Sequence, residues 1–226
     1  LDIESLQPFH WGYEFDAIFE RGGFDAIITN PPWEVFKPQA KEFFNEFSDI
    51  VSKNKMTIKE FEKEQASLLI NPEIKSAWLD YLSRFPFVSL YFRSSAQFPH
   101  QTAVVNGKKT GSDVNLYKLF TEQSFNLLKE NGECGIVIPS GIYTDLGAKG
   151  LRDLLFNKTE ITGLFCFENR KTIFEGVDSR FKFVVLTFVK SPNLPGFKNL
   201  EGLSEQQFPA EFMRHEVSEL SNFPNS

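Results

Sequence analysis

The stretch that decides the fold is Phe24-Asp25-Ala26-Ile27-Ile28-Thr29, which leads directly into Asn30-Pro31-Pro32-Trp33. The first six residues form a short apolar run, and such runs are typical of buried β-strands. Two consecutive prolines cannot continue a strand, because proline lacks the backbone N–H that pairs with a neighbour. The sequence therefore predicts a buried strand near residues 24–30 with an amide, two prolines and an indole at its carboxyl end.

The tetrad Asn30-Pro31-Pro32-Trp33 contains the groups needed to methylate a planar amine. Such an amine is a poor nucleophile while its lone pair is delocalised into the ring, and acceptors on its two N–H bonds draw the pair out. The side-chain oxygen of Asn30 is one candidate acceptor. The carbonyl of Pro31 is the other, because a carbonyl before proline lies in a stiff, extended segment. Trp33 would stack on the aromatic base that carries the amine. The alternative without a catalytic role is a Pro-Pro turn that ends a strand.

The tetrad resembles the catalytic motif of adenine-specific (N6) DNA methyltransferases, and its setting resembles the large type II restriction-modification enzymes of that class. The lead-in Pro8-Phe9-His10-Trp11 shares this resemblance. The resemblance implies S-adenosylmethionine as the methyl donor, double-stranded DNA as the partner, and adenine that is flipped out of the duplex. It implies catalytic roles for Asn30, Pro31, Pro32 and Trp33, cofactor contacts for Asn30 and Pro32, and no metal.

A second block, Asn115-Leu116-Tyr117-Lys118-Leu119-Phe120, opens a stretch with apolar residues at helical spacing. The stretch stops at Glu130-Asn131-Gly132, and a strand is expected near residues 133–139. In the family that the tetrad resembles, the corresponding element lines the cofactor pocket. On that resemblance Phe120 is a candidate contact to the adenine ring of the cofactor, and an ordinary position in a helix core is the alternative.

A third block, Phe165 to Val177, is followed by the strongly apolar run Phe181 to Val189. Strands are expected near residues 160–168 and 181–189, as an antiparallel pair at the sheet edge. In the family that the chain resembles, a phenylalanine between the corresponding strands packs on the extruded base, opposite the catalytic aromatic residue. Phe174 occupies that position. Because the chain contains 26 phenylalanines, a place in the core is the alternative.

The fold class expected is α/β, the C-terminal half of a Rossmann-like S-adenosylmethionine-dependent methyltransferase sheet with a helical insertion. Residues 1–191 form the predicted catalytic portion, with the insertion at about 38–105, and residues 192–226 form a connector toward a missing target-recognition region. Helices are expected over Ala40 to Val51, Thr57 to Leu69 and Glu73 to Phe85, with loops at Phe85-Pro86-Phe87 and Val104 to Ser112.

The sequence does not show the glycine-rich loop after a first strand that holds the cofactor in this class of methyltransferase. The glycines Gly12, Gly22-Gly23, Gly147 and Gly150 do not form that signature. We therefore expect the N-terminal, cofactor-binding half before residue 1 and a C-terminal recognition domain after residue 226. The chain alone is expected to bind the cofactor poorly and to be inactive.

Composition limits the remaining functions. The net charge of −6 disfavours binding to DNA through its phosphates, so the basic residues needed for the duplex are expected on the missing parts. No apolar run approaches the roughly 18 residues of a membrane span. Cys134 and Cys166 are expected to be reduced core residues of a cytoplasmic protein. The three histidines stand singly, which disfavours a zinc site.

Two other classes of function stay open on the sequence. A protein-glutamine methyltransferase shares the tetrad, but it would lack the insertion and the base-stacking phenylalanine. A non-catalytic DNA-binding or assembly module would leave Trp33 and Phe174 in separate places. Methylation of the cytosine amine is also compatible with the chemistry. The distance between the rings of Trp33 and Phe174 separates the module from the enzymes.

Overall fold

The computed structural model describes residues 9–48, 51, 56–102, 104–105, 108–109, 113–171 and 173–191. By its contacts the chain divides into two compact units, one formed by residues 1–34 and 100–226 and the other by residues 35–99. The predicted connector, residues 192–226, lies outside the described residues.

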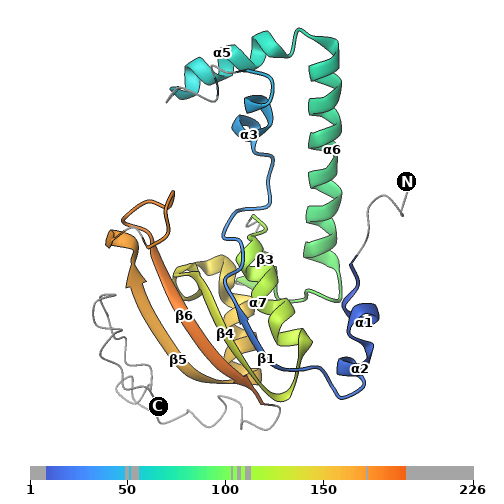
Figure 1. The fold of residues 1–226 in the computed structure, drawn as a ribbon, viewed down its shortest axis with the longest axis vertical. Coiled ribbons are helices and arrows are strands. Elements are labelled where there is room, and N and C mark those ends of the chain that lie inside the picture. Colours follow the sequence, from blue (N-terminus) through green and yellow to red (C-terminus); the bar gives the residue numbers. More distant parts are fainter. Residues whose placement is uncertain are drawn as a thin grey trace. The chain divides into compact units, whose positions relative to one another are not determined.

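The first unit is built on a four-stranded sheet with the order β1-β4-β6-β5 (Figure 1). Its strands are β1 (Phe24–Thr29), β4 (Leu128–Pro139), β5 (Thr159–Glu168) and β6 (Lys182–Lys190). β1 runs parallel to β4, whereas β6 is antiparallel to both β4 and β5. The predicted α/β class and the antiparallel pair at the edge are confirmed. A two-stranded ribbon, β2 (Val104–Val105) and β3 (Lys108–Lys109), lies where only loop was predicted.

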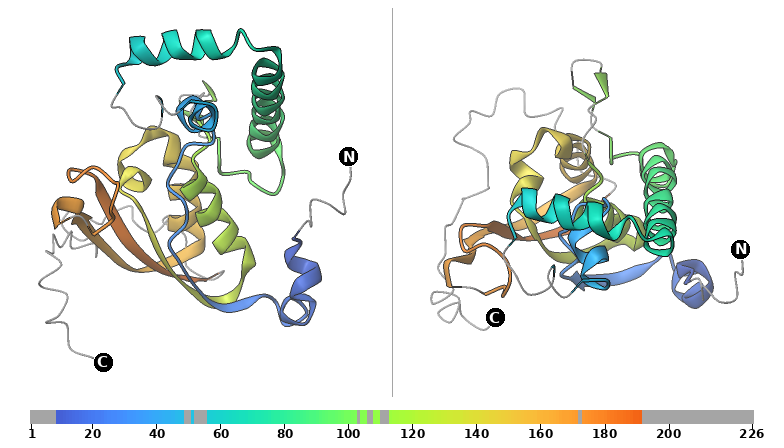
Figure 2. Two further views of the ribbon diagram at one scale, coloured as in Figure 1. Left: turned by 45° about the horizontal axis from the view of Figure 1, so that its top comes forward. Right: turned by 90° about the horizontal axis from the view of Figure 1, so that it is seen from above.

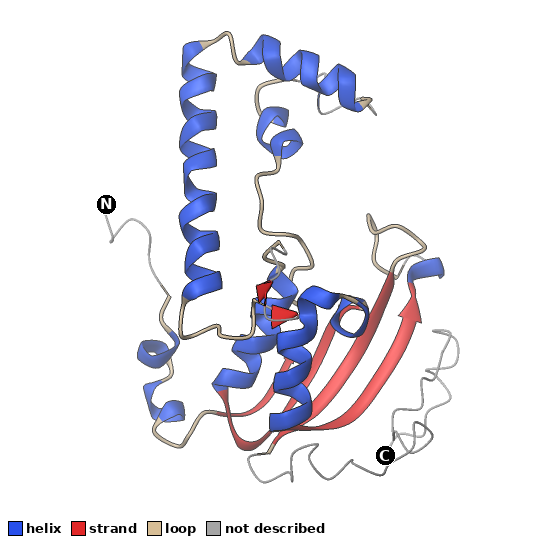
Figure 3. Ribbon diagram, turned by 180° about the vertical axis from the view of Figure 1, so that it is seen from behind, coloured by secondary structure: helices blue, strands red, loops and turns tan. Residues whose placement is uncertain are grey.

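Helices α7 (Leu116–Leu127) and α9 (Lys149–Lys158) lie side by side against one face of the sheet (Figures 2 and 3). The short helices α8 (Gly141–Thr144) and η1 (Leu146–Ala148) connect β4 to α9. The core between these layers consists of aliphatic side chains, among them the fully buried Leu128, Ile136, Ile138, Leu151 and Val184. Within the described residues, no helix is long and apolar enough to cross a bilayer.

Residues 24–29 form the predicted strand, but the prediction that this strand is buried is wrong. Among the residues that the structure describes, β1 pairs only with β4, because it stands at the end of the strand order, and none of its six residues is buried. Ile28 leaves 91% of its surface exposed. An apolar run shows that a strand tends to be covered, but it does not show whether the covering element belongs to the same unit.

The junction between α7 and β4 also differs from the prediction, because the helix ends at Leu127 and the strand begins at once. Phe24 of β1 pairs with Leu128 and Ala26 pairs with Glu133, so the intervening residues of β4 form a bulge. Asn131 takes a positive φ of 62° in this bulge. The Glu130-Asn131-Gly132 signal therefore marks a bulge inside the strand rather than the turn that precedes it.

The entrance to β1 is fixed by the lead-in. The helices α1 (Trp11–Glu14) and α2 (Asp16–Phe19) precede it, and the rings of Trp11, Phe15 and Phe19 all contact Phe24. Gly23 has a φ of 123°, and a Cβ atom there would stand 2.4 Å from the carbonyl oxygen of Leu127. Only glycine fits this approach of the chain to the α7–β4 junction.

The second unit contains helices α3 (Ala40–Asn45), α5 (Ile58–Leu68) and α6 (Pro72–Ser94). Its core is formed by Phe44, Val51, Phe61 and Trp78. Thr57 and Glu60 form a capping box at the start of α5, and Asn71 caps α6. The predicted loop at Phe85-Pro86-Phe87 is wrong, since α6 continues through Pro86. Ring contacts of Phe36 with Phe85 and Phe92, on either side of the proline, help to offset its cost of about 3 kcal/mol.

Candidate active site

The tetrad lies where β1 ends, and β4 fixes its indole. The last pair between the two strands joins Thr29 to Ile136, and β4 then runs on to Pro139. The next carbonyl of β4, that of Val137, accepts a hydrogen bond of 3.2 Å from Nε1 of Trp33. The end of the shorter strand thus leaves an acceptor that orients the tryptophan ring.

A pocket of about 480 Å³ opens beside the tetrad. One side, the strand wall, is formed by Asn30, Pro31, Trp33 and Glu34. The other side, the loop wall, is formed by Ile173, Phe174, Glu175 and Val177. Four of the predicted site residues therefore share one pocket, although more than 130 residues separate the two walls in the sequence. Pro32 is exposed and does not line this pocket.

The indole of Trp33 is half-buried between phenylalanine rings. It stacks on Phe181 and Phe183, with ring centroids 5.6 and 5.9 Å away. The ring of Phe174 meets it edge-on, with the centroids 4.8 Å apart and an interplanar angle of 66°. The non-catalytic alternative expected Trp33 and Phe174 to lie apart, and they do not.

The loop between β5 and β6 is organised by Asn169, the first residue of η2 (Asn169–Lys171). The side chain of Asn169 is fully buried. Its Nδ2 donates to the carbonyl oxygens of Phe174 and Val177, and its Oδ1 accepts from the Phe174 N–H, each at 3.0 Å. The sequence interpretation did not single out this residue. Its signal is weak, since asparagines that bond to nearby backbone are common in loops.

The second sequence block reaches the tetrad through the backbone. The N–H of Leu116, the first residue of α7, donates a hydrogen bond of 3.0 Å to the carbonyl oxygen of Glu34. Phe120 lies one turn further along α7 with 44% of its surface exposed, and it does not line the pocket of the tetrad. Its role as a cofactor contact stays a prediction.

Charged groups near the pocket are exposed. Glu34 and Glu175 place a carboxylate on each wall. In the loop beyond them, the side chain of Arg180 hydrogen-bonds to Asp178 and lowers the pKa of that carboxyl to about 2. Among the residues that the structure describes, no three His, Cys, Asp or Glu side chains are grouped so that they could hold a metal ion.

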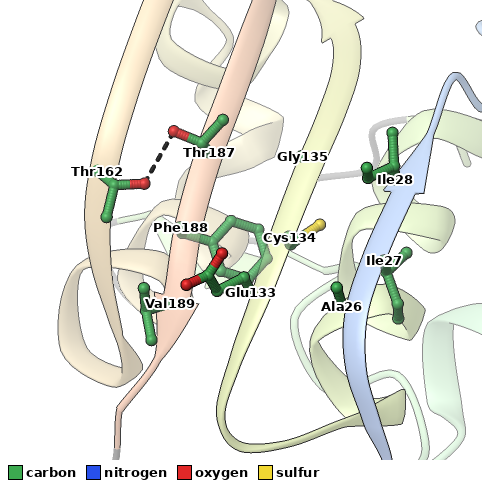
Figure 4. Close-up of a pocket in the computed structure, with 10 residues that line it drawn as sticks. All are labelled: Ala26, Ile27, Ile28, Glu133, Cys134, Gly135, Thr162, Thr187, Phe188 and Val189. Carbon is green, nitrogen blue, oxygen red and sulfur yellow. Dashed lines mark hydrogen bonds between the residues drawn. The ribbon is translucent and has the colours of Figure 1, made fainter. Parts of the chain in front are cut away.

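A second, smaller pocket of about 390 Å³ lies on the sheet itself (Figure 4). Ala26, Glu133 and Val189 form one row across the strands, and Ile28, Gly135 and Thr187 form the next. Thr162 and Thr187 share a hydrogen bond of 2.8 Å. Burial raises the pKa of Cys134 to about 12, so its thiol stays protonated and is a weak nucleophile. No residue of the tetrad lines this pocket.

The chain matches the Eco57I restriction-modification methylase family over residues 2–71 and 90–174, which is more than half of its length. The chain belongs to this family. The family match includes the tetrad, Phe120, Asn169 and Phe174, and it ends before Phe181 and Phe183, the two phenylalanines that stack on Trp33.

Relatives of this Eco57I-family chain belong to restriction-modification systems. A protein of Methanocaldococcus jannaschii, described as a candidate type II restriction enzyme and methyltransferase, is 45% identical over 42 residues, which cover 18% of the chain and 4% of that protein. Two Type ISP restriction-modification enzymes have been solved with DNA or a DNA substrate mimic, LlaBIII and a nuclease-deletion mutant of LlaGI. Their TM-scores are 0.37 and 0.39, and their identities are 15% and 20%. The alignments cover 81% and 80% of the chain but only 10% and 12% of those enzymes.

Proposed function

We propose that the chain is the target-base portion of a DNA methyltransferase in a restriction-modification or phage-defence system, and that the methyl group of S-adenosylmethionine is transferred to the exocyclic amine of adenine. The single observation that carries the proposal is the pocket shared by Asn30, Pro31, Trp33 and Phe174. An amide, a backbone carbonyl next to proline and two aromatic rings are the groups needed to grip a planar amine and its ring.

The chemistry assigned to the chain's own residues is binding and orientation. The Asn30 Oδ1 atom accepts one amine N–H and the Pro31 carbonyl accepts the other, which turns the nitrogen lone pair out of conjugation. Trp33 stacks on the base and keeps the amine at a fixed place in the pocket. The bound cofactor would supply the methyl group: the methyl–sulfur bond would break as the carbon–nitrogen bond forms, the sulfur would keep the electron pair, and one amine proton would leave to water. Neither the asparagine amide nor the proline carbonyl has to act as a base.

The residues present fit the methyl-bearing end of the cofactor, which when bound supplies a methyl group on a positively charged sulfur. A pocket of about 480 Å³ is within the roughly 300–1,000 Å³ of small-molecule sites. The carboxylates of Glu34 and Glu175 favour a cation there. Asn30 is the proposed contact to this end inside the pocket, and Pro32 is the proposed contact to the cofactor just outside the pocket lining. The exposed ring of Phe120 is the proposed contact to the adenine.

The rest of the enzyme is proposed to lie on other parts of the protein. The outer edge of β1 has no partner strand among the described residues, and an unpaired edge can accept further strands. We place the cofactor-binding half of a Rossmann-like sheet there. With a net charge of −6, the chain is not suited to hold double-stranded DNA by its phosphates. We assign that task to a recognition domain beyond residues 192–226, and we assign residues 1–191 to the catalytic portion.

The test is methyl transfer by the full-length protein from a tritiated donor to duplex DNA, followed by analysis of the labelled nucleosides. We expect the label in N6-methyladenine. Label in N4-methylcytosine would contradict the proposed base, and label on a peptide glutamine with none on DNA would favour the protein-methylating alternative. If neither the DNA nor any protein carries label, the proposed methyltransferase function is contradicted.

A further inference from the structure

The position of Phe174 conflicts with the simplest picture of a base held between two aromatic rings. A base stacked between parallel rings needs about 7 Å between their planes, which is twice the usual carbon–carbon contact distance. The centroids of Trp33 and Phe174 are only 4.8 Å apart, and the rings meet at 66°. The Phe174 ring therefore leaves no room for a base between itself and Trp33.

Asn169 holds the residue that carries this ring from both sides. Its carboxamide accepts from the N–H of Phe174 and donates to the carbonyl oxygen of the same residue. A further bond to the carbonyl oxygen of Val177 secures the next turn of the loop. The backbone N–H of Asn169 donates to the carbonyl oxygen of Phe181 at 2.9 Å, which closes the base of the loop.

The other described contacts of Phe174 are weaker on its backbone: the Val177 N–H donates to its carbonyl oxygen at 3.3 Å, and its ring meets Phe183 edge-on with the centroids 5.0 Å apart. Ile173, Glu175 and Gly176 are exposed, so they contribute little buried apolar area. Gly176 has a φ of 81°, and a Cβ atom there would meet nothing within 4 Å. A buried amide with all three of its strong bonds made to loop backbone is therefore the main constraint on the backbone of Phe174.

We propose that Asn169 is a positioning residue, which pins the backbone of Phe174 so that its ring fills the base site beside Trp33 in the free protein and turns aside on its side-chain bonds when a base binds. Asn169 itself does not touch the base. It acts through Phe174, which is a plug before the base binds and a stacking platform afterwards. This inference rests on the proposed function for the meaning of the site, but the contact between the two rings can be measured without activity.

The first experiment observes the ring contact by ¹⁹F NMR of the chain labelled with 5-fluorotryptophan. The chain has three tryptophans, so Trp11 and Trp78 serve as internal controls for folding. Phe174→Ala gives the position of the Trp33 signal without the neighbouring ring. We expect Asn169→Ala to move the Trp33 signal toward that position and to leave the other two signals in place. The matched control is Asn157→Ala, which removes an exposed asparagine that bonds to Asp153, and it should move none of them.

A second measurement on the unmodified chain keeps the inference testable if Asn169→Ala unfolds. The Phe174 N–H should exchange with solvent at least about tenfold more slowly than an unstructured amide, because Asn169 accepts its hydrogen. Exchange at the unstructured rate would overturn the proposal. A Trp33 signal that moves in Phe174→Ala but stays in place in a folded Asn169→Ala would also overturn it.

The activity of the full-length protein separates this inference from the proposed function. Asn169→Ala and Phe174→Ala should each lower kcat/KM for methyl transfer by roughly fivefold to 100-fold, the range of one lost stacking contact. Combined, they should cost no more than the larger single effect, because both act through one ring. If the losses in kcat/KM of the two single variants multiply in the double variant, the positioning role of Asn169 is wrong, whereas the proposed methyltransferase function is unaffected. If no transfer occurs at all but the NMR results hold, the proposed function fails and the pinning stands.

Discussion

The two walls of the pocket differ in what holds them. The strand wall follows the end of a strand, is stiffened by two prolines and is tied to β4 through the indole of Trp33. The loop wall spans the gap between β5 and β6 and depends on the buried amide of Asn169. The groups proposed to meet the reacting amine are thus on the wall that follows a strand, and the ring proposed to move is on the wall that is held mainly by the side chain of one residue, Asn169. A site that has to open needs this difference.

The largest difference between the two walls should appear when the side-chain amide of Asn30 is removed from the strand wall. We expect Asn30→Ala to lower kcat for methyl transfer by roughly 10²–10³-fold, as for the loss of one preorganised polar group at a reacting centre. The KM for DNA should change little, since Asn30 is exposed and the contacts to the DNA phosphates are assigned to other parts of the protein. Steady-state rates with tritiated methyl donor measure both constants. Asn157→Ala is the control, and an equal loss in both variants would contradict the assignment.

Two glycines, Gly23 just before β1 and Gly176 in the loop between β5 and β6, test how tightly the chain is packed near each wall. Gly23→Ala combines a φ of 123° with a Cβ atom 2.4 Å from a backbone oxygen at the start of β1. We expect it to lower the free energy of unfolding by roughly 3 kcal/mol or more. Gly176→Ala adds only the strain of a φ of 81° in open space, which is about 1 kcal/mol. Urea denaturation of both variants measures the difference, and similar losses would contradict the tighter packing of the chain at the start of β1.

The link between Trp33 and β4 can be removed without removing the ring. Trp33→Phe deletes the indole N–H that bonds to the carbonyl oxygen of Val137, and we expect a loss of about 1 kcal/mol in the free energy of unfolding. Stacking on Phe181 and Phe183 should largely survive. Trp33→Leu also loses the stacking and should be the less stable variant. A Trp33→Phe protein with the original stability would mean that the hydrogen bond does not hold the strand wall.

The smallest expected effect is a pH dependence confined to the loop. The pKa of Asp178 is lowered to about 2, well below the usual range of an aspartate, mainly by its hydrogen bond with Arg180. Because the folded pKa is depressed, the contribution of Asp178 to stability is present above about pH 4 and is lost as the pH falls toward 2. Arg180→Gln should return the carboxyl titration, followed by NMR, toward that usual range. Arg84→Gln, whose partner is Asp80, should leave the titration of Asp178 unchanged.

Some features could be predicted because their cause is local. The apolar run before Asn30 predicts a strand, and the two prolines predict its end, since both effects act over a few residues. The helices of residues 35–99 follow from spacing and capping residues, yet α6 runs through Pro86 because tertiary ring contacts support it. Phe174 could be named only through a resemblance, since 26 phenylalanines look alike in the sequence.

Other features could not be predicted because they depend on which segments meet. Asn169 reaches backbone atoms five and eight residues away, and nothing in the sequence specifies the loop conformation that brings them there. The exposure of β1 was missed, because an apolar strand looks the same whether its cover lies in this unit or elsewhere. The edge-on contact of Phe174 with Trp33 requires the insertion of β6 between β4 and β5.

By itself the sequence determined a strand that ends in Asn30-Pro31-Pro32-Trp33, a second aromatic candidate far along the chain, and an α/β class. Only the tertiary structure decided that the two share one pocket and that the ring of Phe174 lies edge-on against Trp33. The physical reason is the range of the forces involved. Backbone preferences and proline geometry act within a few residues, whereas ring packing and the bonds of a buried amide exist only after distant segments have come together.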